Sequence, residues 1–382
     1  MPTGDLRQNN QTRWFNVIYL DNAATTKPCR ECVRAVTETM ENFYGNASSL
    51  HKMGTASINI INRAKQAVLK GLSLGGAPLE GDVIFTSGAT ESSNTALFGL
   101  NLRLGSKIVT TAMEHPSVAR TIDRLAERGY NVVRLAPKDY ADFEEAIINA
   151  VDESTSLVSC MAVNNETGFR VDVKRLYKAV KAKNPRAFVH IDAVQGFLKI
   201  PLDGDVISAS GHKIHSSKGI GALYIKKGIA LAPLLSGGGQ QKNLRSGTEA
   251  VELIAGLEAA VNAYKYDFER FSELKNRLVG GISAIDNVKL NSDEKCLPNI
   301  VNFSVRGVRS EIMLHSLEQH DICVSSGSAC SKGKTSGVLS AFGVSDKDAD
   351  CALRVSMCAE NTPEEIDFLC EKIAEAVKRF RR

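Results

Sequence analysis

The chain has 382 residues, of which 43% are hydrophobic and 24% are charged, and its formal net charge is +4. This composition is typical of a globular protein with two or three domains of about 150 residues, and it excludes a largely disordered chain. The small net charge gives no indication of nucleic-acid binding. No apolar run reaches the about 18–20 residues of a membrane span, and the first residues lack the apolar core of a signal peptide. We therefore expect a soluble, cytoplasmic protein without membrane or direct nucleic-acid partners.

The nine cysteines are scattered along the chain, which is typical of reduced thiols in a large protein rather than of a disulfide framework. Cys29 and Cys32 form a single CxxC pair just after Pro28. One such pair is a weak signal for zinc or redox chemistry, and it also fits two unreactive thiols one turn apart on a helix. The sequence does not decide whether these two residues have a role.

Strand and helix patterns alternate over the first two thirds of the chain. The expected strands are 17–20, 82–85, 107–110, 131–135, 156–160, 187–191, 205–208 and 221–225. The expected helices are 29–42, 55–72, 90–102, 116–128, 140–151 and 172–183. Such alternation predicts an α/β fold with a mainly parallel sheet that is covered by helices on both faces. Ligands of such sheets bind beyond the carboxyl ends of the strands.

The pattern changes after the glycine-rich segment 236–241. It predicts a long helix from about 249 to 280, a strand at 299–305, a helix near 309–320, two further strand segments and a final helix that begins at Thr362. This arrangement indicates a smaller α+β domain. We expect a larger domain at 15–258 and a smaller one at 259–382, with residues 1–14 belonging to the smaller.

A lysine and an acid follow two of the expected strands. Lys213 lies in SGHKIHSSKGIG, and a lysine among small residues at a strand end is a candidate for a Schiff base, although a surface lysine is the ordinary alternative. Asp192 ends an apolar strand, where a buried acid needs a cationic partner. The protonated ring nitrogen of pyridoxal phosphate is such a partner.

Two further segments place polar residues at strand ends. In FTSGATESSN a turn leads into a helix near Thr90, and the amides and hydroxyls of a helix start can bind phosphate. His115 follows another expected strand, just before a helix. There is no GxGxxG motif, which disfavours a dinucleotide-binding fold. Taken alone, each segment also fits a purely structural role.

Nine motifs occur in one order along the chain. They are YLDNAATT (19–26), NASSLH (46–51), FTSGATES (85–92), EHPSV (114–118), VNNETG (163–168), HIDAVQ (190–195), SGHKIH (210–215), RSGTE (245–249) and SSGSAC (325–330). Together they closely resemble the pyridoxal-phosphate-dependent cysteine desulfurases of the NifS/IscS type, which belong to the class V aminotransferases. The resemblance spans about residues 17–375 and implies the fold type I architecture of these enzymes.

The resemblance implies a role for each matching residue. Lys213 would hold the cofactor as a Schiff base, Asp192 would pair with its ring nitrogen, and His115 would stack on the ring and assist proton transfer. Arg354, with Asn165, would bind the substrate carboxylate, work that suits a planar bidentate donor. The remaining cofactor contacts would come from Ala89, Thr90, Asn165, Gln195, Ser210 and His212, and from Thr248 of the second subunit of a homodimer.

Cys330 lies in a segment, 327–337, that is rich in Gly, Ser and Lys. This composition predicts an exposed loop in which neighbouring lysines favour the thiolate. The resemblance implies that Cys330, carried by the smaller domain, is the nucleophile that takes sulfur from the substrate as a persulfide. No resident metal site is predicted, although Cys330 could be an iron–sulfur ligand during transfer.

The resemblance therefore implies an enzyme that converts L-cysteine to L-alanine and passes the sulfur to a scaffold for iron–sulfur clusters or to a thiolation protein. Three alternatives stay open on the sequence. A selenocysteine lyase or another class V enzyme would keep Lys213 and Asp192, and a non-catalytic assembly scaffold could keep the fold alone. The identity of the sulfur acceptor and any need for an activating protein cannot be read from the sequence.

Overall fold

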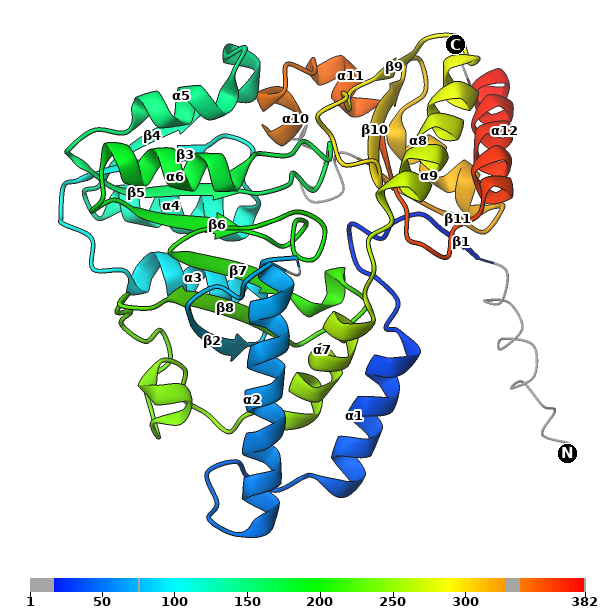
Figure 1. The fold of residues 1–382 in the computed structure, drawn as a ribbon. Helices are drawn as coiled ribbons and strands as arrows, with labels where there is room; N and C mark the ends of the chain where they lie inside the picture. Colours follow the sequence, from blue (N-terminus) through cyan, green and yellow to red (C-terminus); the bar gives the residue numbers. More distant parts are fainter. Residues whose placement is uncertain (1–16, 75, 327–336, 381–382) are drawn as a thin grey trace, which may run out of the picture.

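A computed structural model describes residues 17–74, 76–326 and 337–380. The chain forms two units of unequal size that lie side by side (Figure 1). The larger unit contains a seven-stranded sheet, and the smaller one a four-stranded antiparallel sheet. Within these three described ranges, no helix combines the length and the apolar composition needed to cross a membrane.

The larger sheet is mostly parallel. Its strands run in the order β2 (Gly81–Thr86), β8 (Gly221–Lys226), β7 (Val206–Ser210), β6 (Phe188–Asp192), β5 (Thr155–Met161), β3 (Lys107–Thr111) and β4 (Asn131–Leu135). β8 is antiparallel to both of its neighbours, and the other pairs are parallel. Every residue of β7 is buried, as expected for a strand in a sheet that is covered on both faces. All of these strands were predicted from the sequence.

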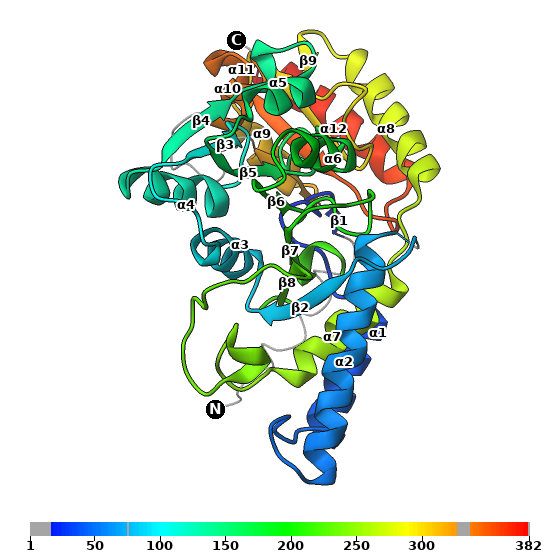
Figure 2. The ribbon, with the colours of Figure 1, turned by 60° about the vertical axis from the view of Figure 1, so that its left-hand side comes forward.

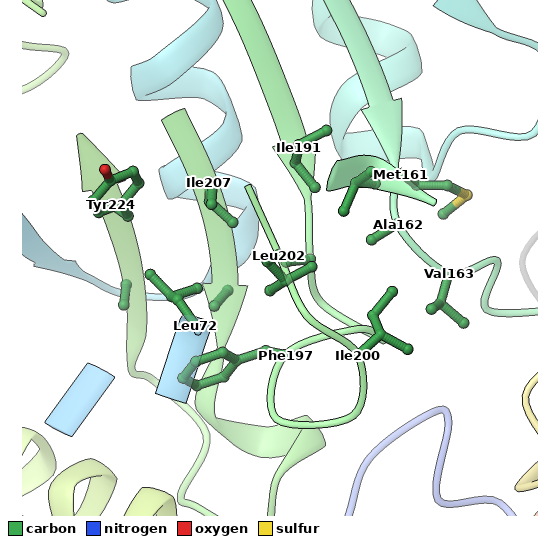
Figure 3. Packing of buried hydrophobic residues seen from close by; sticks show 14 of the residues in the cluster. Leu72, Met161, Ala162, Val163, Ile191, Phe197, Ile200, Leu202, Ile207 and Tyr224 are labelled. Carbon is green, nitrogen blue, oxygen red and sulfur yellow. The ribbon is translucent and has the colours of Figure 1, made fainter. Parts of the chain in front are cut away.

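Helices cover both faces of this sheet. One apolar cluster joins the sheet to α3 (Ala89–Gly99) and α4 (Pro116–Glu127), and another joins it to α2 (Lys52–Leu72), α5 (Phe143–Ala150), α6 (Val173–Lys183) and α7 (Val251–Ala263). Figure 2 shows α3 and α4 on one side of the sheet and α2 and α6 on the other. Leu72 and Phe197 pack close to Ile207 and Tyr224 (Figure 3). α1 (Arg30–Asn42) packs against α7.

The smaller unit has its own core. Its sheet has the order β12 (Ser325–Ser326), β13 (Ala352–Ser356), β10 (Ile300–Val305) and β9 (Val288–Leu290). The apolar sides of α8 (Phe268–Ser283), α9 (Ser310–Glu318) and α12 (Pro363–Phe380) pack with it. Short helices α10 (Gly337–Ala341) and α11 (Asp346–Asp350) precede β13, and 3-10 helices η1 (Pro137–Asp139), η2 (Gly211–Lys213) and η3 (Gln240–Asn243) lie in connections of the larger unit.

The first predicted strand belongs to the smaller unit, which corrects its expected place in the alternating pattern of the larger one. β1 (Ile18–Tyr19) pairs in parallel with β11 (Ile322–Cys323). Leu20 is fully buried in the apolar cluster of α8, α9 and α12. The local pattern of residues 17–20 predicts a strand but carries no information about a partner some 300 residues away along the chain.

The predicted helix at 249–280 is also corrected, because the structure divides it into α7 and α8. At the end of α7, Tyr264 adopts an extended conformation. The side chain of Asp267 then accepts a hydrogen bond from the Arg270 amide at 3.0 Å and caps a new helix. This break lets α7 pack in the larger unit and α8 in the smaller one.

Candidate active site

A cavity of about 760 Å³ lies at the carboxyl ends of the parallel strands, where its wall includes residues of both units. It brings together most of the residues that the sequence singled out. The predicted residues that line it are Ala89, Thr90, His115, Asn165, Asp192, Gln195, Ser210, His212, Lys213 and Arg354. Thr248 is exposed and does not line this cavity, and Cys330 lies outside the described residues.

Lys213 lies on η2, directly after β7. Its amine donates hydrogen bonds to the carbonyl oxygens of Ala23 and Ala24, each at 2.6 Å. The adjacent backbone is fixed in turn, because the Thr26 amide donates to the His212 carbonyl oxygen at 2.9 Å. Residues 23–26 of the YLDNAATT segment therefore hold Lys213 in position at the end of β7.

Asp192 is the last residue of β6, is buried and lines the cavity. One of its oxygens accepts a hydrogen bond from the Val194 amide at 3.0 Å. Burial raises the pKa of Asp192, against the lowering effects of that amide and of His115 and Lys213. A buried carboxyl of this kind is suited to a cationic group of a ligand.

His115 caps the N-terminus of α4 and is exposed to the cavity. Its Nδ1 accepts a hydrogen bond from the Ser117 amide at 3.2 Å, so the neutral ring carries its proton on Nε2. Desolvation lowers the pKa of His115, the Asp192 carboxylate opposes this shift, and the charge of Lys213 adds to it. The ring is therefore neutral at physiological pH and can accept or hold a proton.

The start of α3 also lines the cavity. Gly88 is the N-cap residue of this helix and has no side chain to cap it. The first-turn amides, which begin at Ala89 and Thr90, therefore receive no hydrogen bond from an N-cap side chain. Ser210 and His212 line the same cavity from the β7 side. Amides at a helix start together with hydroxyl groups make a site for a phosphate or another anion.

Arg354 reaches the cavity from β13 of the smaller unit. Its Nη1 donates to the Asn165 carbonyl oxygen at 2.9 Å, and its Nη2 donates to the Asp21 carboxylate at 2.7 Å and to the Ser325 hydroxyl at 3.0 Å. Its Nε and the side-chain oxygen of Asn165 are both buried and have no hydrogen-bond partner among the described residues. This unsatisfied donor and acceptor suit a small polar ligand.

Sequence reasoning missed three side chains that hold the predicted residues in place. Asp21 and Ser325 contact Arg354, and Lys199 donates to the side-chain oxygen of Gln195 at 3.4 Å. Asp21 and Ser325 do lie inside YLDNAATT and SSGSAC. The two motifs could therefore have pointed to Asp21 and Ser325, but a motif does not show that these residues contact Arg354. Lys199 follows HIDAVQ and carried no signal of its own.

Comparison with known proteins assigns the chain to a family. The model of the aminotransferase class-V family matches residues 18–369. The chain belongs to this family. A cysteine desulfurase of Trichormus azollae is 37% identical to it, over 96% of this chain and 94% of that protein. A solved NifS-like protein has a TM-score of 0.84 at 34% identity, and the match covers 95% of this chain and 100% of that one.

A further solved relative is SspA in complex with cysteine, which has a TM-score of 0.77 at 28% identity, over 89% of this chain and 98% of that one. These matches confirm the predicted family and the predicted fold type I architecture. Enzymes of this family depend on pyridoxal phosphate. In the ranges that the structure describes, no group of three or more His, Cys, Asp or Glu side chains is arranged to bind a metal ion.

Proposed function

We propose that the protein is a pyridoxal-phosphate-dependent cysteine desulfurase, which converts L-cysteine to L-alanine and takes up the sulfur on a cysteine of its own. The observation that carries the proposal is the position of Lys213 and Asp192 in one cavity, at the ends of the neighbouring strands β7 and β6. An amine and a buried carboxyl in this arrangement match the aldehyde and the protonated ring nitrogen of the cofactor.

The described residues fit this cofactor. Asp192 is a buried carboxyl with a raised pKa, and the uncapped start of α3 suits the phosphate. When bound, pyridoxal phosphate supplies an electron sink for the bond that breaks at the substrate α-carbon. Lys213 would hold it covalently, and the residues proposed to surround it are Ala89, Thr90, His115, Asn165, Asp192, Gln195, Ser210 and His212.

The substrate carboxylate is proposed to bind Arg354 and Asn165. The unsatisfied Nε of Arg354 is a charged donor, which makes stronger hydrogen bonds to a carboxylate than a neutral donor does. The neutral ring of His115 lies in the same cavity and can take up a proton that leaves the α-carbon. The binding of cysteine by the relative SspA supports L-cysteine as the substrate.

Cys330 is the proposed sulfur acceptor within the chain, on the basis of its motif alone, since it lies outside the described residues. Its thiolate attacks the sulfur of the substrate, so that an S–S bond forms and the C–S bond breaks. The electron pair of the broken bond stays with carbon, which takes a proton as the product becomes L-alanine. The resulting persulfide would pass to an iron–sulfur scaffold or to a thiolation protein in the cytoplasm.

A homodimer with shared sites is part of the proposal. α1 and the segment that links it to α2 carry large exposed apolar side chains, at Met40, Tyr44 and Leu50. These helices extend away from the larger sheet (Figure 1), and such a surface is suited to a second copy of the chain. The exposed Thr248 would then contact the cofactor of the other subunit.

The test is alanine formation from L-cysteine with a thiol reductant, by the wild type, Cys330→Ala and Cys358→Ala. Cys358 is a half-buried thiol and serves as the matched control. We expect equimolar alanine and sulfide from the wild type and from Cys358→Ala, and neither product from Cys330→Ala. Full activity of Cys330→Ala would contradict the assigned nucleophile, and a wild type that binds the cofactor but makes no alanine would contradict the substrate.

A further inference from the structure

The CxxC pair lies at the start of α1 with its two thiols in different surroundings. Cys29 is the N-cap of the helix, and its sulfur accepts a hydrogen bond from the Cys32 amide, with a distance of 3.4 Å between sulfur and nitrogen. The sulfur of the N-cap residue therefore lies beside the backbone of the third helical residue, whose side chain carries the second thiol. Rotation of the Cys32 side chain toward the Cys29 sulfur is the movement that an S–S bond of about 2.0 Å requires.

The two thiols differ in access. Cys29 lines a second cavity, of about 260 Å³, which shares Ala23, Gln195 and Lys213 with the site described above. Cys32 is only 1% exposed, and its sulfur lies 3.8 Å from the Ser216 hydroxyl. An accessible thiol followed by a buried one gives each a role in thiol–disulfide exchange, because the first can meet an external disulfide and the second can displace it.

The pair is joined to the backbone on both sides of Lys213. The Cys29 amide donates to the carbonyl oxygen of His215 at 2.8 Å, and the His215 amide donates to the hydroxyl of Thr26 at 2.8 Å. Together with the bond from Thr26 to His212, these contacts tie segment 26–29 to segment 212–215. A change in the first turn of α1 therefore reaches the segment that carries the lysine.

We propose that Cys29 and Cys32 form a redox-active dithiol, and that its oxidation to a disulfide alters the backbone around Lys213. The oxidant is a low-molecular-weight disulfide such as glutathione disulfide. The Cys29 thiolate attacks one sulfur of this disulfide and releases one thiol, which takes a proton. The Cys32 thiolate then attacks the Cys29 sulfur and releases the second thiol. Two protein thiols are oxidised and one external disulfide is reduced, so atoms and electrons balance.

The pair can be detected directly by peptide mapping. Trypsin cleaves after Arg30, between the two cysteines, and leaves the bond between Lys27 and Pro28 intact. A disulfide therefore joins the peptide that ends at Arg30 to the tetrapeptide 31–34. Burial raises the pKa of the Cys29 thiol, so the full-length holoprotein is treated with glutathione disulfide at mildly alkaline pH, alkylated and digested without reduction.

We expect the joined peptides, with the loss of two hydrogen atoms, in the wild type, and their disappearance after reduction. Cys32→Ser, which keeps the Cys29 cap, gives instead a stable mixed disulfide of Cys29 with glutathione. Full alkylation of both cysteines in the treated wild type, or disulfides from either of them to other cysteines, would overturn the proposal. The map reads the two thiols themselves, so its outcome is independent of whether the chain makes alanine.

The link to Lys213 has its own readout. Amide hydrogen exchange is compared before and after oxidation in the wild type and in Cys32→Ser, so that oxidation of other thiols is present in both samples. We expect faster exchange in segments 26–29 and 212–215 of the oxidised wild type and no such change in Cys32→Ser. Equal exchange in the reduced and oxidised wild type would show that the disulfide forms without reaching the lysine segment, and would overturn that part of the proposal.

Discussion

Arg354 and Asp21 form an ion pair, with 2.7 Å between Nη2 and Oδ1, that joins β13 to the end of the N-terminal strand at the wall of the cavity. Both side chains are largely buried, at 10% and 19% exposure. The arginine that is proposed to bind the substrate carboxylate is thus already neutralised by a carboxylate of the chain. Asp21 holds the guanidinium in place and also competes for its donors.

Replacing Asp21 by asparagine is expected to lower the KM for L-cysteine several-fold, because the full charge of Arg354 becomes available to the substrate. The same change should lower the free energy of unfolding by about 1–3 kcal/mol, since a charged hydrogen bond is lost. Steady-state kinetics and urea unfolding measure the two effects. Asp367→Asn, which breaks an exposed ion pair with Arg277, is the control and should change stability by less than about 1 kcal/mol. A higher KM in Asp21→Asn would mean that Asp21 only positions the arginine.

The fall of kcat/KM at acid pH should reflect protonation of His115. A base must be neutral to accept a proton, and the pKa of His115 lies below its usual 6.5, so kcat/KM should stay high until the pH falls below 6.5. Loss of the ring in His115→Gln should lower kcat/KM by about 10²–10⁴-fold, the usual contribution of such a group. His315→Gln, on the exposed side of α9, should leave the profile unchanged. If kcat/KM of His115→Gln fell at low pH in the same way as in the wild type, another group would be responsible for that fall.

Asp192→Asn is expected to stabilise the cofactor-free protein while it abolishes tight cofactor binding. The folded-state pKa of Asp192 is raised, so the folded protein holds this proton more tightly than the unfolded chain, and stability falls as the pH rises through that pKa. The amide removes this fall and should add about 1–3 kcal/mol at neutral pH. Urea unfolding at several pH values, with and without pyridoxal phosphate, measures both effects.

Asp205 supplies the matched control for that change. It is equally buried, but it pairs with Lys181 and accepts hydrogen bonds from the Tyr177 hydroxyl at 3.0 Å and the Val189 amide at 2.9 Å. Asp205→Asn should therefore destabilise the protein, because a partnered charge is lost. If Asp192→Asn and Asp205→Asn changed the free energy of unfolding in the same direction, the result would contradict the claim that Asp205 is stabilised by its partners in the chain whereas Asp192 awaits a ligand.

Lys199→Met should remove a pH-dependent part of the stability. Burial, together with the charge of Lys213, lowers the pKa of Lys199 to about 7, so between pH 7 and the usual lysine value the unfolded chain binds more protons than the folded one. Stability from this group therefore rises with pH over that window, and the methionine variant should lack the rise. Urea unfolding at pH 7 and pH 9 tests this, with the exposed Lys178→Met as control. An identical rise in Lys199→Met would contradict the shift.

Short-range patterns were sufficient to predict most elements of the larger unit, because a buried parallel strand is a continuous apolar run and its helices are amphipathic. They also placed Asp192 and Lys213 at strand ends. The antiparallel direction of β8 could not be predicted, since direction depends on the path of the intervening chain. The break between α7 and α8 depends on one cap at Asp267, and a polar residue within a long amphipathic pattern gives little warning of it.

The contacts within the cavity were less accessible to sequence reasoning. Motif resemblance names Arg354 and Gln195, but their partners Asp21 and Lys199 are set by how strands from different parts of the chain come together. Those partners decide charge and orientation. The sequence therefore predicts which residues line the site better than it predicts the protonation and geometry of each.

The pairing of β1 with β11 has a consequence for protein synthesis. Residues 18–20 leave the ribosome some 300 residues before their partners at 322–323 and 356. The larger unit can form its sheet before these partners are made, whereas Asp21 meets Arg354 only after β13 has been translated. A nascent chain that ends before β13 thus lacks the arginine side of the cavity, and the capacity to take sulfur from a substrate arises only after Arg354 has been made.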